Sequence, residues 1–315
     1  MTEILGLGLD GGGTQTRWAL VAAEGHLRAQ GEAPALPRPA DGASVAAAAE
    51  VLCGIAASLP PQARPALATH GAVCAGFTGF DAGDAAAWAR VFRQAFDVPA
   101  ERTALASDIE MACRGAFEPG EGVLLLAGTG AIAGHVDAAG AFHRAGGRGV
   151  LIDDAGGGHW IAVEALRQVW RDEDERPGAG ADSALGRYLF ARLGGSDWPS
   201  TRRAVVGASR GEIGALALAV AAAAREGDVA AQALLRRAGT ELARPARALL
   251  HRCGVVALAF AGRVFELGPA VEAGLRQALP DGLRVRPETR PAALRSAQRA
   301  ALAALAARRA MGQPS

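Results

Sequence analysis

The stretch ILGLGLDGGGTQTRWALVAAEG, residues 4–25, decides how the fold is interpreted. An apolar run ends in Asp10, and three Gly and two Thr follow before a second apolar run. This pattern predicts two strands, 4–10 and 17–23, joined by a Gly/Thr hairpin. Strand interiors do not favour so many glycines, so we expect that side chains are absent there because something must approach the main chain closely.

The same pattern restarts at GVLLLAGTGAIAGHVDAAG, residues 122–140. The two Gly/Thr turns lie about 117 residues apart, from Gly11 to Gly128. Each hairpin is followed by a third strand and then by alternating helices and strands. In the first half we expect one of these later strands at 70–75. This duplication predicts an α/β protein with two similar halves, mixed sheets flanked by helices, and a ligand cleft between the halves.

Composition narrows the class of protein. The chain has 315 residues, 50% hydrophobic and 21% charged, with a net charge of +1 and no Lys. This balance gives no reason to expect a nucleic acid or a membrane surface as partner. The four Cys form no CxxC pair, which predicts free thiols and a reducing cytoplasm. No apolar run reaches about 18 residues, so we predict no membrane span. The cysteines are Cys53, Cys74, Cys113 and Cys253.

The first turn has the chemistry of a phosphate loop. Glycine N–H groups can approach an anion closely, and Thr hydroxyls add donors. A carboxylate beside a phosphate makes sense if Mg²⁺ lies between them, held through water by Asp10. The alternative is a plain Gly-rich hairpin. The predicted phosphate-binding residues are Gly11, Gly12, Gly13, Thr14 and Thr16, with Gly128, Thr129 and Gly130 in the second turn.

Two further places carry carboxylates. Asp108 follows a predicted strand and opens a short helix, so it is either a helix cap or a base that accepts a proton from an attacking hydroxyl. Gly146 and Gly147 open a GGRG segment that leads to Asp153 and Asp154. Carboxylates between Gly clusters favour a polyol site, but a solvated loop that caps the following helix fits equally well.

Together these motifs resemble the BadF/BadG/BcrA/BcrD ATPase family, and within it the N-acetylglucosamine kinases and related amino-sugar kinases. The motifs are DGGGTQT at 10–16, SD at 107–108, GTGA at 128–131 and GGRG…DDAGGG at 146–158. The resemblance implies the actin/sugar kinase/Hsp70 fold, with two ribonuclease-H-like domains around an ATP cleft. We expect domains at 1–117 and 118–290, with a helix at about 291–310 packing back on the first.

The resemblance also implies roles. Asp108 would be the catalytic base and would contact the substrate, and Gly146, Gly147 and Asp153 would bind sugar hydroxyls. Gly262, after a predicted strand at 255–261, would lie in the adenosine motif. ATP and Mg²⁺ would be the cofactors, and a homodimer the assembly. The lack of a Cys cluster argues against the dehydratase-activating branch of the family and against the zinc-containing repressor/kinase group.

Departures from the family pattern lie mainly on the sugar side. Arg148 replaces a Trp, Ile152 a Gly, Asp154 a Glu, Gly156 a Ser and Arg263 a Gly, and no Asn occurs at 36–40. We expect an ATP-dependent kinase for the 6-hydroxyl of an amino sugar, most simply N-acetylglucosamine. Glucosamine and an N-acetylmuramic acid-type sugar stay open as substrates. An acidic sugar is considered because Arg38 and Arg148 lie in substrate-side segments. A sensor that binds nucleotide and sugar without turnover also stays open.

Overall fold

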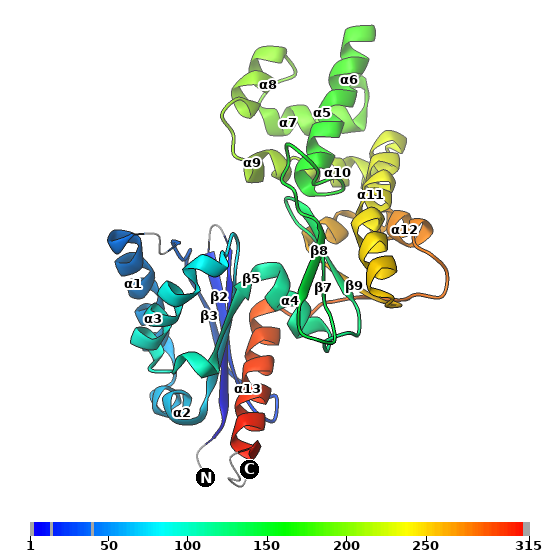
Figure 1. The fold of residues 1–315 in the computed structure, drawn as a ribbon. Coiled ribbons are helices and arrows are strands. Elements are labelled where there is room, and N and C mark those ends of the chain that lie inside the picture. Colours follow the sequence, from blue (N-terminus) through cyan, green and yellow to red (C-terminus); the bar gives the residue numbers. More distant parts are fainter. Residues whose placement is uncertain (1–2, 13–14, 39–40, 311–315) are drawn as a thin grey trace. The chain divides into compact units, whose positions relative to one another are not determined.

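The chain folds into two compact units (Figure 1). The structure, a computed structural model, describes residues 3–12, 15–38 and 41–310. Unit 1 comprises Met1–Glu118 and Thr289–Ser315, and unit 2 comprises Pro119–Glu288. Each unit is built on one five-stranded sheet.

The sheet of unit 1 has the order β3-β2-β1-β4-β5. β2 pairs antiparallel with β1 and β3, whereas β4 and β5 continue the sheet in parallel with β1. The strands are β1 (Leu5–Gly11), β2 (Gln15–Ala22), β3 (Leu27–Pro34), β4 (Ala72–Phe77) and β5 (Thr103–Ser107). The hairpin predicted from residues 4–25 is therefore the β1–β2 pair.

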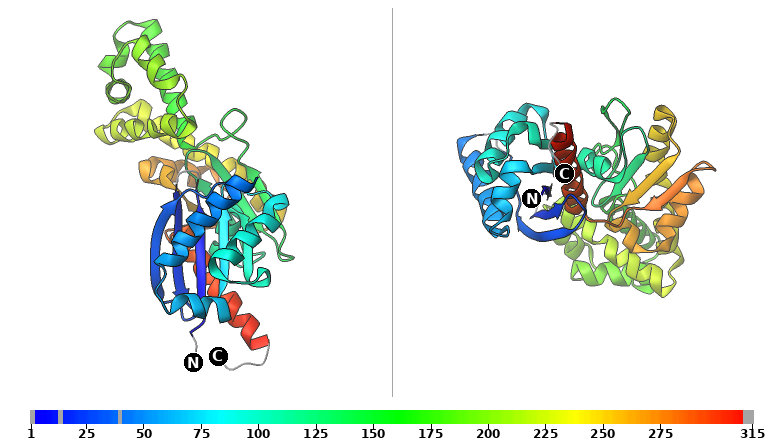
Figure 2. Two further views of the ribbon diagram at one scale, coloured as in Figure 1. Left: turned by 90° about the vertical axis from the view of Figure 1, so that its left-hand side faces the viewer. Right: turned by 90° about the horizontal axis from the view of Figure 1, so that it is seen from below.

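Helices cover both faces of this sheet (Figure 1). One face packs on α1 (Gly42–Ser58), α2 (Ala63–His70) and α3 (Ala85–Phe96), with the 3₁₀ turns η1 (Ala82–Asp84) and η2 (Ala100–Arg102) between elements. The other face packs on α4 (Asp108–Ala116) and α13 (Ala292–Ala310). Figure 2, seen from below, shows α13 in red alongside the strands of unit 1.

The two faces of β1 differ because Leu and Gly alternate along it. Leu5, Leu7 and Leu9 are buried toward α1–α3. Gly6 and Gly8 face α13, whose backbone lies so close that a Cβ on either glycine would overlap main-chain atoms of Ala293, Ala297 or Ala301. The glycines thus allow a helix to lie directly on the strand.

Unit 2 repeats the topology, with the strand order β10-β9-β6-β7-β8. β6 and β9 are parallel, as are β9 and β10, whereas β7 is antiparallel to both β6 and β8. The strands are β6 (Val123–Ala127), β7 (Ala131–Val136), β8 (Phe142–Gly146), β9 (Ala257–Ala261) and β10 (Arg284–Pro287). The predicted fold, two mixed sheets with flanking helices, is confirmed.

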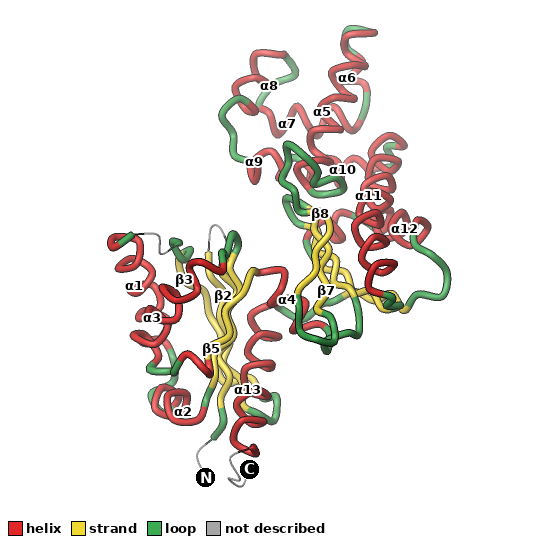
Figure 3. Tube along the Cα trace, in the orientation of Figure 1, coloured by secondary structure: helices red, strands yellow, loops and turns green. Residues whose placement is uncertain are grey.

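The helices of unit 2 form one large core with the sheet. The long α11 packs across β6, β7 and β8, and α12 packs on α11. Figure 3 shows α6 to α9 gathered beyond one end of the sheet. The helices are α5 (Gly158–Glu175), α6 (Ala179–Asp182), α7 (Ala184–Leu193), α8 (Trp198–Val205), α9 (Arg210–Ala215), α10 (Ala217–Glu226), α11 (Val229–Cys253) and α12 (Pro269–Ala278), with the 3₁₀ turn η3 (Arg263–Leu267) after β9.

One local expectation from the sequence is wrong. The pattern 70–75 suggests a strand, yet His70 ends α2 and β4 runs from Ala72 to Phe77. The ARPALATH segment places Ala63, Ala66 and Leu67 on one buried helical face, which takes His70 out of the strand. The strand therefore ends two residues later than the sequence suggests.

Within the described residues, no single helix is long and apolar enough to cross a membrane. The bent pair α1 and α2 passes the test of length and composition only when taken together.

We predict that Gly8→Ala destabilises the protein by about 2 kcal/mol or more, because the new methyl group would force α13 off the sheet. Equilibrium denaturation in urea measures the change. The matched control is Gly54→Ala on α1, where a Cβ meets nothing within 4 Å. That substitution should stabilise the helix by up to about 1 kcal/mol. Equal effects of the two substitutions would contradict the packing argument.

Candidate functional site

Three parallel strands of unit 1 end together at one edge of the sheet. In the β1–β4 ladder Asp10 lies opposite Gly76, and in the β4–β5 ladder Phe77 lies opposite Ser107. Asp10, Thr78 and Asp108 therefore follow one another along the carboxyl edge, the side where open α/β sheets bind ligands.

Asp108 is the first residue of α4, and its carboxylate is held by two donors. The Ile109 N–H donates to Oδ1 at 2.8 Å, and the Thr78 hydroxyl donates to Oδ2 at 2.8 Å. The N-cap of the helix is Ser107, whose hydroxyl accepts from the Glu110 N–H at 3.3 Å. Because Ser107 caps the helix, capping alone does not explain the carboxylate at Asp108.

Asp10 lies at the end of β1 in an environment that disfavours its charge. Burial is the main cause that raises the pKa of Asp10, and the negative charge of Asp108 raises it further. Arg17 and Arg295 act in the opposite direction, and the net direction is upward. A buried carboxylate that is destabilised by a second negative charge marks a place where a cation would be favoured.

The residues at this edge fit Mg²⁺ better than a metal with a full protein cage. In the described part of the chain, no group of three or more His, Cys, Asp or Glu side chains could hold a metal. Mg²⁺ commonly takes only one or two carboxylates and completes its shell with water and phosphate oxygens. Asp10 is half-buried and is repelled by the negative charge of Asp108, so it suits this mode of Mg²⁺ binding.

The Gly/Thr turn between β1 and β2 is only partly described. The Gly12 N–H donates to the Gln15 carbonyl at 3.0 Å and closes the turn beyond Gly11. Gly13 and Thr14, two of the predicted phosphate ligands, lie outside the described residues. Thr16 is fully buried in β2, and among the described residues its hydroxyl has no hydrogen-bond partner. The structure therefore places this hydroxyl inside the sheet rather than on the surface of the turn.

The second Gly/Thr turn joins β6 to β7 and lies on the start of α5. The Gly158 N–H donates to the Gly128 carbonyl at 2.8 Å, and the His159 N–H donates to the Thr129 carbonyl at 3.0 Å. The Asp154 carboxylate fills the space beside Gly130, where a Cβ would overlap it. The turn, the Asp-containing segment and the start of α5 thus form one packed group.

The neighbouring aspartates have different environments. Asp154 is buried, and its Oδ1 accepts from the Gly149 N–H at 3.1 Å. Asp153 accepts from Arg244 on α11 through both oxygens at 2.7 Å, and this hydrogen bond is the main cause that lowers the pKa of Asp153. The predicted sugar ligand Asp153 is therefore already paired with an arginine that the sequence did not point to.

The GGRG segment continues the edge of the sheet. Gly146 ends β8, and the Gly147 N–H donates to the Ala131 carbonyl at 2.9 Å. Arg148 is exposed, and its charge helps to lower the pKa of Asp153. Leu151 and Ile152 beyond it are 97% and 78% exposed. Arg38 in unit 1, by contrast, forms ion pairs with Asp81 and Asp84.

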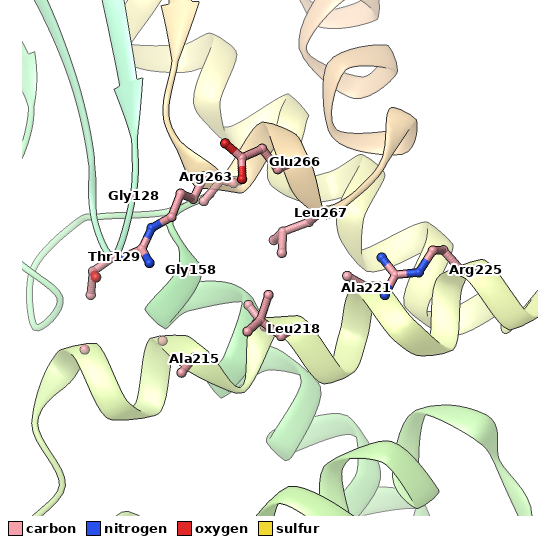
Figure 4. A pocket seen from close by; sticks show the side chains of 14 residues that line it. Gly128, Thr129, Gly158, Ala215, Leu218, Ala221, Arg225, Arg263, Glu266 and Leu267 are labelled. Atoms are coloured by element: carbon pink, nitrogen blue, oxygen red, sulfur yellow. The ribbon is translucent and has the colours of Figure 1, made fainter. Parts of the chain in front are cut away.

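A cavity of about 300 Å³ lies within unit 2 between the β6–β7 turn and the helices α9 and α10 (Figure 4). Its walls are mainly small and apolar, with Arg225, Arg263 and Glu266 as the charged side chains. The lining residues are Gly128, Thr129, Gly158, Gly211, Gly214, Ala215, Ala217, Leu218, Ala221, Arg225, Arg263, Val264, Glu266 and Leu267.

Gly262 connects β9 to this cavity. Its φ of +113° and its contact with the Ala127 backbone, which a Cβ would overlap, both require glycine. The residues that follow it in η3, rather than Gly262 itself, line the cavity. The predicted adenosine glycine thus lies directly before the cavity wall.

Comparison with known proteins gives the family. The family model described as the BadF/BadG/BcrA/BcrD ATPase family matches residues 7–301. The chain belongs to the BadF/BadG/BcrA/BcrD ATPase family. The resemblance inferred from the motifs is therefore confirmed.

Within and around this family, three similar proteins are informative. An N-acetylmuramic acid/N-acetylglucosamine kinase of Clostridium acetobutylicum is 29% identical over 147 residues, 46% of this chain and 47% of that protein. The match thus spans about half the length of that curated relative. A candidate N-acetylglucosamine kinase from Chromobacterium violaceum is 28% identical, with 96% of this chain and 99% of that chain covered and a TM-score of 0.68. A ROK family glucokinase from Streptomyces griseus, 16% identical with 95% and 98% covered and a TM-score of 0.55, shares the fold.

Several residues of this candidate site were not found from the sequence. Thr78 was missed because the expected strand ended at residue 75, three residues before it. The cavity wall on α9 and α10 was missed because the small or apolar residues at 211, 214, 215, 218 and 221 are spaced like an ordinary helical face. Arg244 gave no signal, since it lies 91 residues from its partner Asp153.

We predict that Asp10→Asn is more stable than the wild type near neutral pH. A carboxyl group with a raised pKa contributes stability at low pH, and this contribution is lost as the pH rises through the raised value. The difference between variant and wild type should therefore shrink as the pH falls from about 8 toward about 4. Thermal unfolding across this pH range measures it.

Asp281→Asn, in an exposed loop of unit 2, is the matched control and should leave stability unchanged throughout. A wild type as stable as Asp10→Asn at neutral pH would show that the Asp10 environment is not unfavourable to charge.

Proposed function

We propose that this protein is an ATP-dependent sugar kinase that phosphorylates the 6-hydroxyl of an amino sugar of the N-acetylglucosamine/N-acetylmuramic acid type. Family membership and the named relatives support a sugar kinase. The observation that carries the proposal is the Asp108 carboxylate, fixed by two donors at the carboxyl edge of the sheet and opposed by Asp10.

In this proposal unit 1 supplies the base and the metal ligand. Asp108 accepts the proton from the attacking sugar hydroxyl, because each of its oxygens keeps a lone pair beyond the hydrogen bonds it already accepts. Asp10 holds Mg²⁺ through water, and the ion supplies charge neutralisation at the phosphate oxygens. Glycine N–H groups of the first turn and Thr14 would serve the phosphates, whereas the Thr16 hydroxyl, buried in β2, is left out of this role.

Unit 2 would bind the nucleotide. A cavity of about 300 Å³ with apolar walls suits a purine ring and ribose. Thr129 at its border would serve the phosphate end of the molecule. Arg225, Arg263 and Glu266 provide polar partners around the adenosine.

The sugar side is less regular, and it is where this chain differs most from its family. Gly146, Gly147 and Asp153 are the proposed sugar-binding residues. Asp153 would bind hydroxyls together with Arg244, because the arginine engages both of its oxygens. Arg148 beside this pair keeps an acidic amino sugar among the substrates, whereas Arg38 is engaged by Asp81 and Asp84. Glucosamine stays a further alternative.

The test is a panel of sugars in a coupled ADP-release assay with Mg²⁺ and ATP. It should include N-acetylglucosamine, N-acetylmuramic acid, glucosamine and glucose. We expect ADP release that depends on an N-acetylated amino sugar, and we expect NMR to show that the product is phosphorylated at the 6-position.

Asp108→Asn should lower kcat by about 1,000-fold or more while nucleotide binding is kept, because only the base is removed.

Two outcomes would contradict the kinase. Sugar binding without any ADP release would favour the sensor, and near-normal turnover by Asp108→Asn would remove the base from this position.

The nucleotide cavity gives a separate prediction. Ala215→Trp should weaken binding of a non-hydrolysable ATP analogue by about 10-fold or more, because the indole would fill space beside Leu218. Calorimetric titration measures the affinity. Ala204→Trp, on the exposed surface of α8 and outside the cavity, is the matched control and should bind as the wild type does. Unchanged affinity in Ala215→Trp would place the nucleotide elsewhere.

A further inference from the structure

We propose that Thr78 is a positioning residue that holds the Asp108 carboxylate in place for proton transfer. This rests on the proposed function, in which Asp108 is the base. Thr78 makes two bonds that join separate parts of the edge: its hydroxyl donates to Asp108 Oδ2 at 2.8 Å, and its N–H donates to the Gly11 carbonyl at 3.0 Å. One residue thereby ties the first Gly/Thr turn to the base.

The segment that carries Thr78 is rigidly supported. Phe77 stacks on Trp88 of α3, with ring centroids 4.5 Å apart and planes 6° from parallel. Gly76 packs against the start of α4, where a Cβ would meet Met111 Cβ at 2.8 Å and Asp108 Cα at 3.2 Å. The end of β4 and the start of α4 therefore fit without spare space, so the backbone that carries Thr78 has one defined place relative to Asp108.

The carboxylate has an alternative partner, which is why it needs positioning. A carboxylate at the start of a helix is attracted by the unpaired N–H groups of the first turn. Asp108 Oδ1 already accepts from the Ile109 N–H. Without the Thr78 hydroxyl, nothing among its described hydrogen bonds keeps Oδ2 from turning toward the helix as well. Thr78 therefore directs the second oxygen away from the helix end.

The charged groups around Asp108 come from several elements. Asp10 on β1 is the nearby like charge, and Arg17 on β2 and Arg295 on α13 act on Asp10. Glu110 on α4 is paired with Arg114 at 2.6 Å. Thr78 is uncharged, so replacing it changes the hydrogen bond and leaves this set of charges intact.

The experiment compares three variants with the wild type. Thr78→Val removes the hydroxyl and keeps the shape, and Thr78→Ser keeps the hydroxyl. Thr103→Val is the matched control, because its hydroxyl bonds the Pro99 carbonyl at the other end of β5. We expect Thr78→Val to lose about 10- to 100-fold in kcat, the range for a hydrogen bond to a charged group, with nucleotide affinity kept. Thr78→Ser and Thr103→Val should behave as the wild type.

A second readout does not depend on turnover. In NMR spectra of the full chain, the side-chain carboxyl carbon of Asp108 and the amide of Ile109 should shift in Thr78→Val and stay in place in the other two variants. If the wild type proves inactive on every sugar, the proposed function fails, but these resonances still test whether Thr78 holds the carboxylate. Unchanged resonances in Thr78→Val would overturn the proposal. Equal loss in Thr78→Ser and Thr78→Val would overturn it too, because the hydroxyl would then be irrelevant.

Discussion

The contact on which unit 1 depends is that of α13 with the bare backbone of β1. Gly6 and Gly8 let Ala293, Ala297 and Ala301 lie directly on the strand, and the same helix also packs on α4. Arg299 donates to the Arg114 carbonyl at 2.8 Å, which fixes α4 against α13. The position of α4 in turn sets where Asp108 lies. A side chain at either glycine would therefore disturb the carboxyl edge as well as the core.

The same contact explains the electrostatics of the edge. Asp10 lies on the α13 side of β1, two residues beyond Gly8, and the buried Arg295 near the start of α13 partly offsets the unfavourable environment of its charge. A close helix excludes water from one side of Asp10, and this burial raises its pKa. The contact of α13 with β1 thus both stabilises the sheet and makes the charge of Asp10 unfavourable. Functional sites commonly hold such charged groups at a cost in stability.

Much of the fold could be predicted from the sequence because its signal is local and repeated. The two Gly/Thr hairpins and the alternation of strands and helices indicated two similar α/β halves, and the family resemblance indicated two ribonuclease-H-like domains. The helix at about 291–310 was expected close to where α13 lies. What could not be predicted depends on contacts between distant segments: the purpose of Gly6 and Gly8 within a strand, the Arg244–Asp153 pair, and the cavity wall on α10. Thr78 was hidden by an error of two residues at the end of one strand.

The return of α13 to β1 also shapes how the chain reaches this structure. Unit 2 is formed by one continuous segment, whereas unit 1 needs residues from both ends of the sequence. While the chain is being synthesised, the glycine face of β1 stays uncovered until α13 has been made, almost 300 residues after the strand. Joining them closes a very long loop, which is slow relative to local contacts. Unit 2 can therefore complete its core first, and unit 1 is the half that leaves an open sheet face exposed to other chains in the meantime.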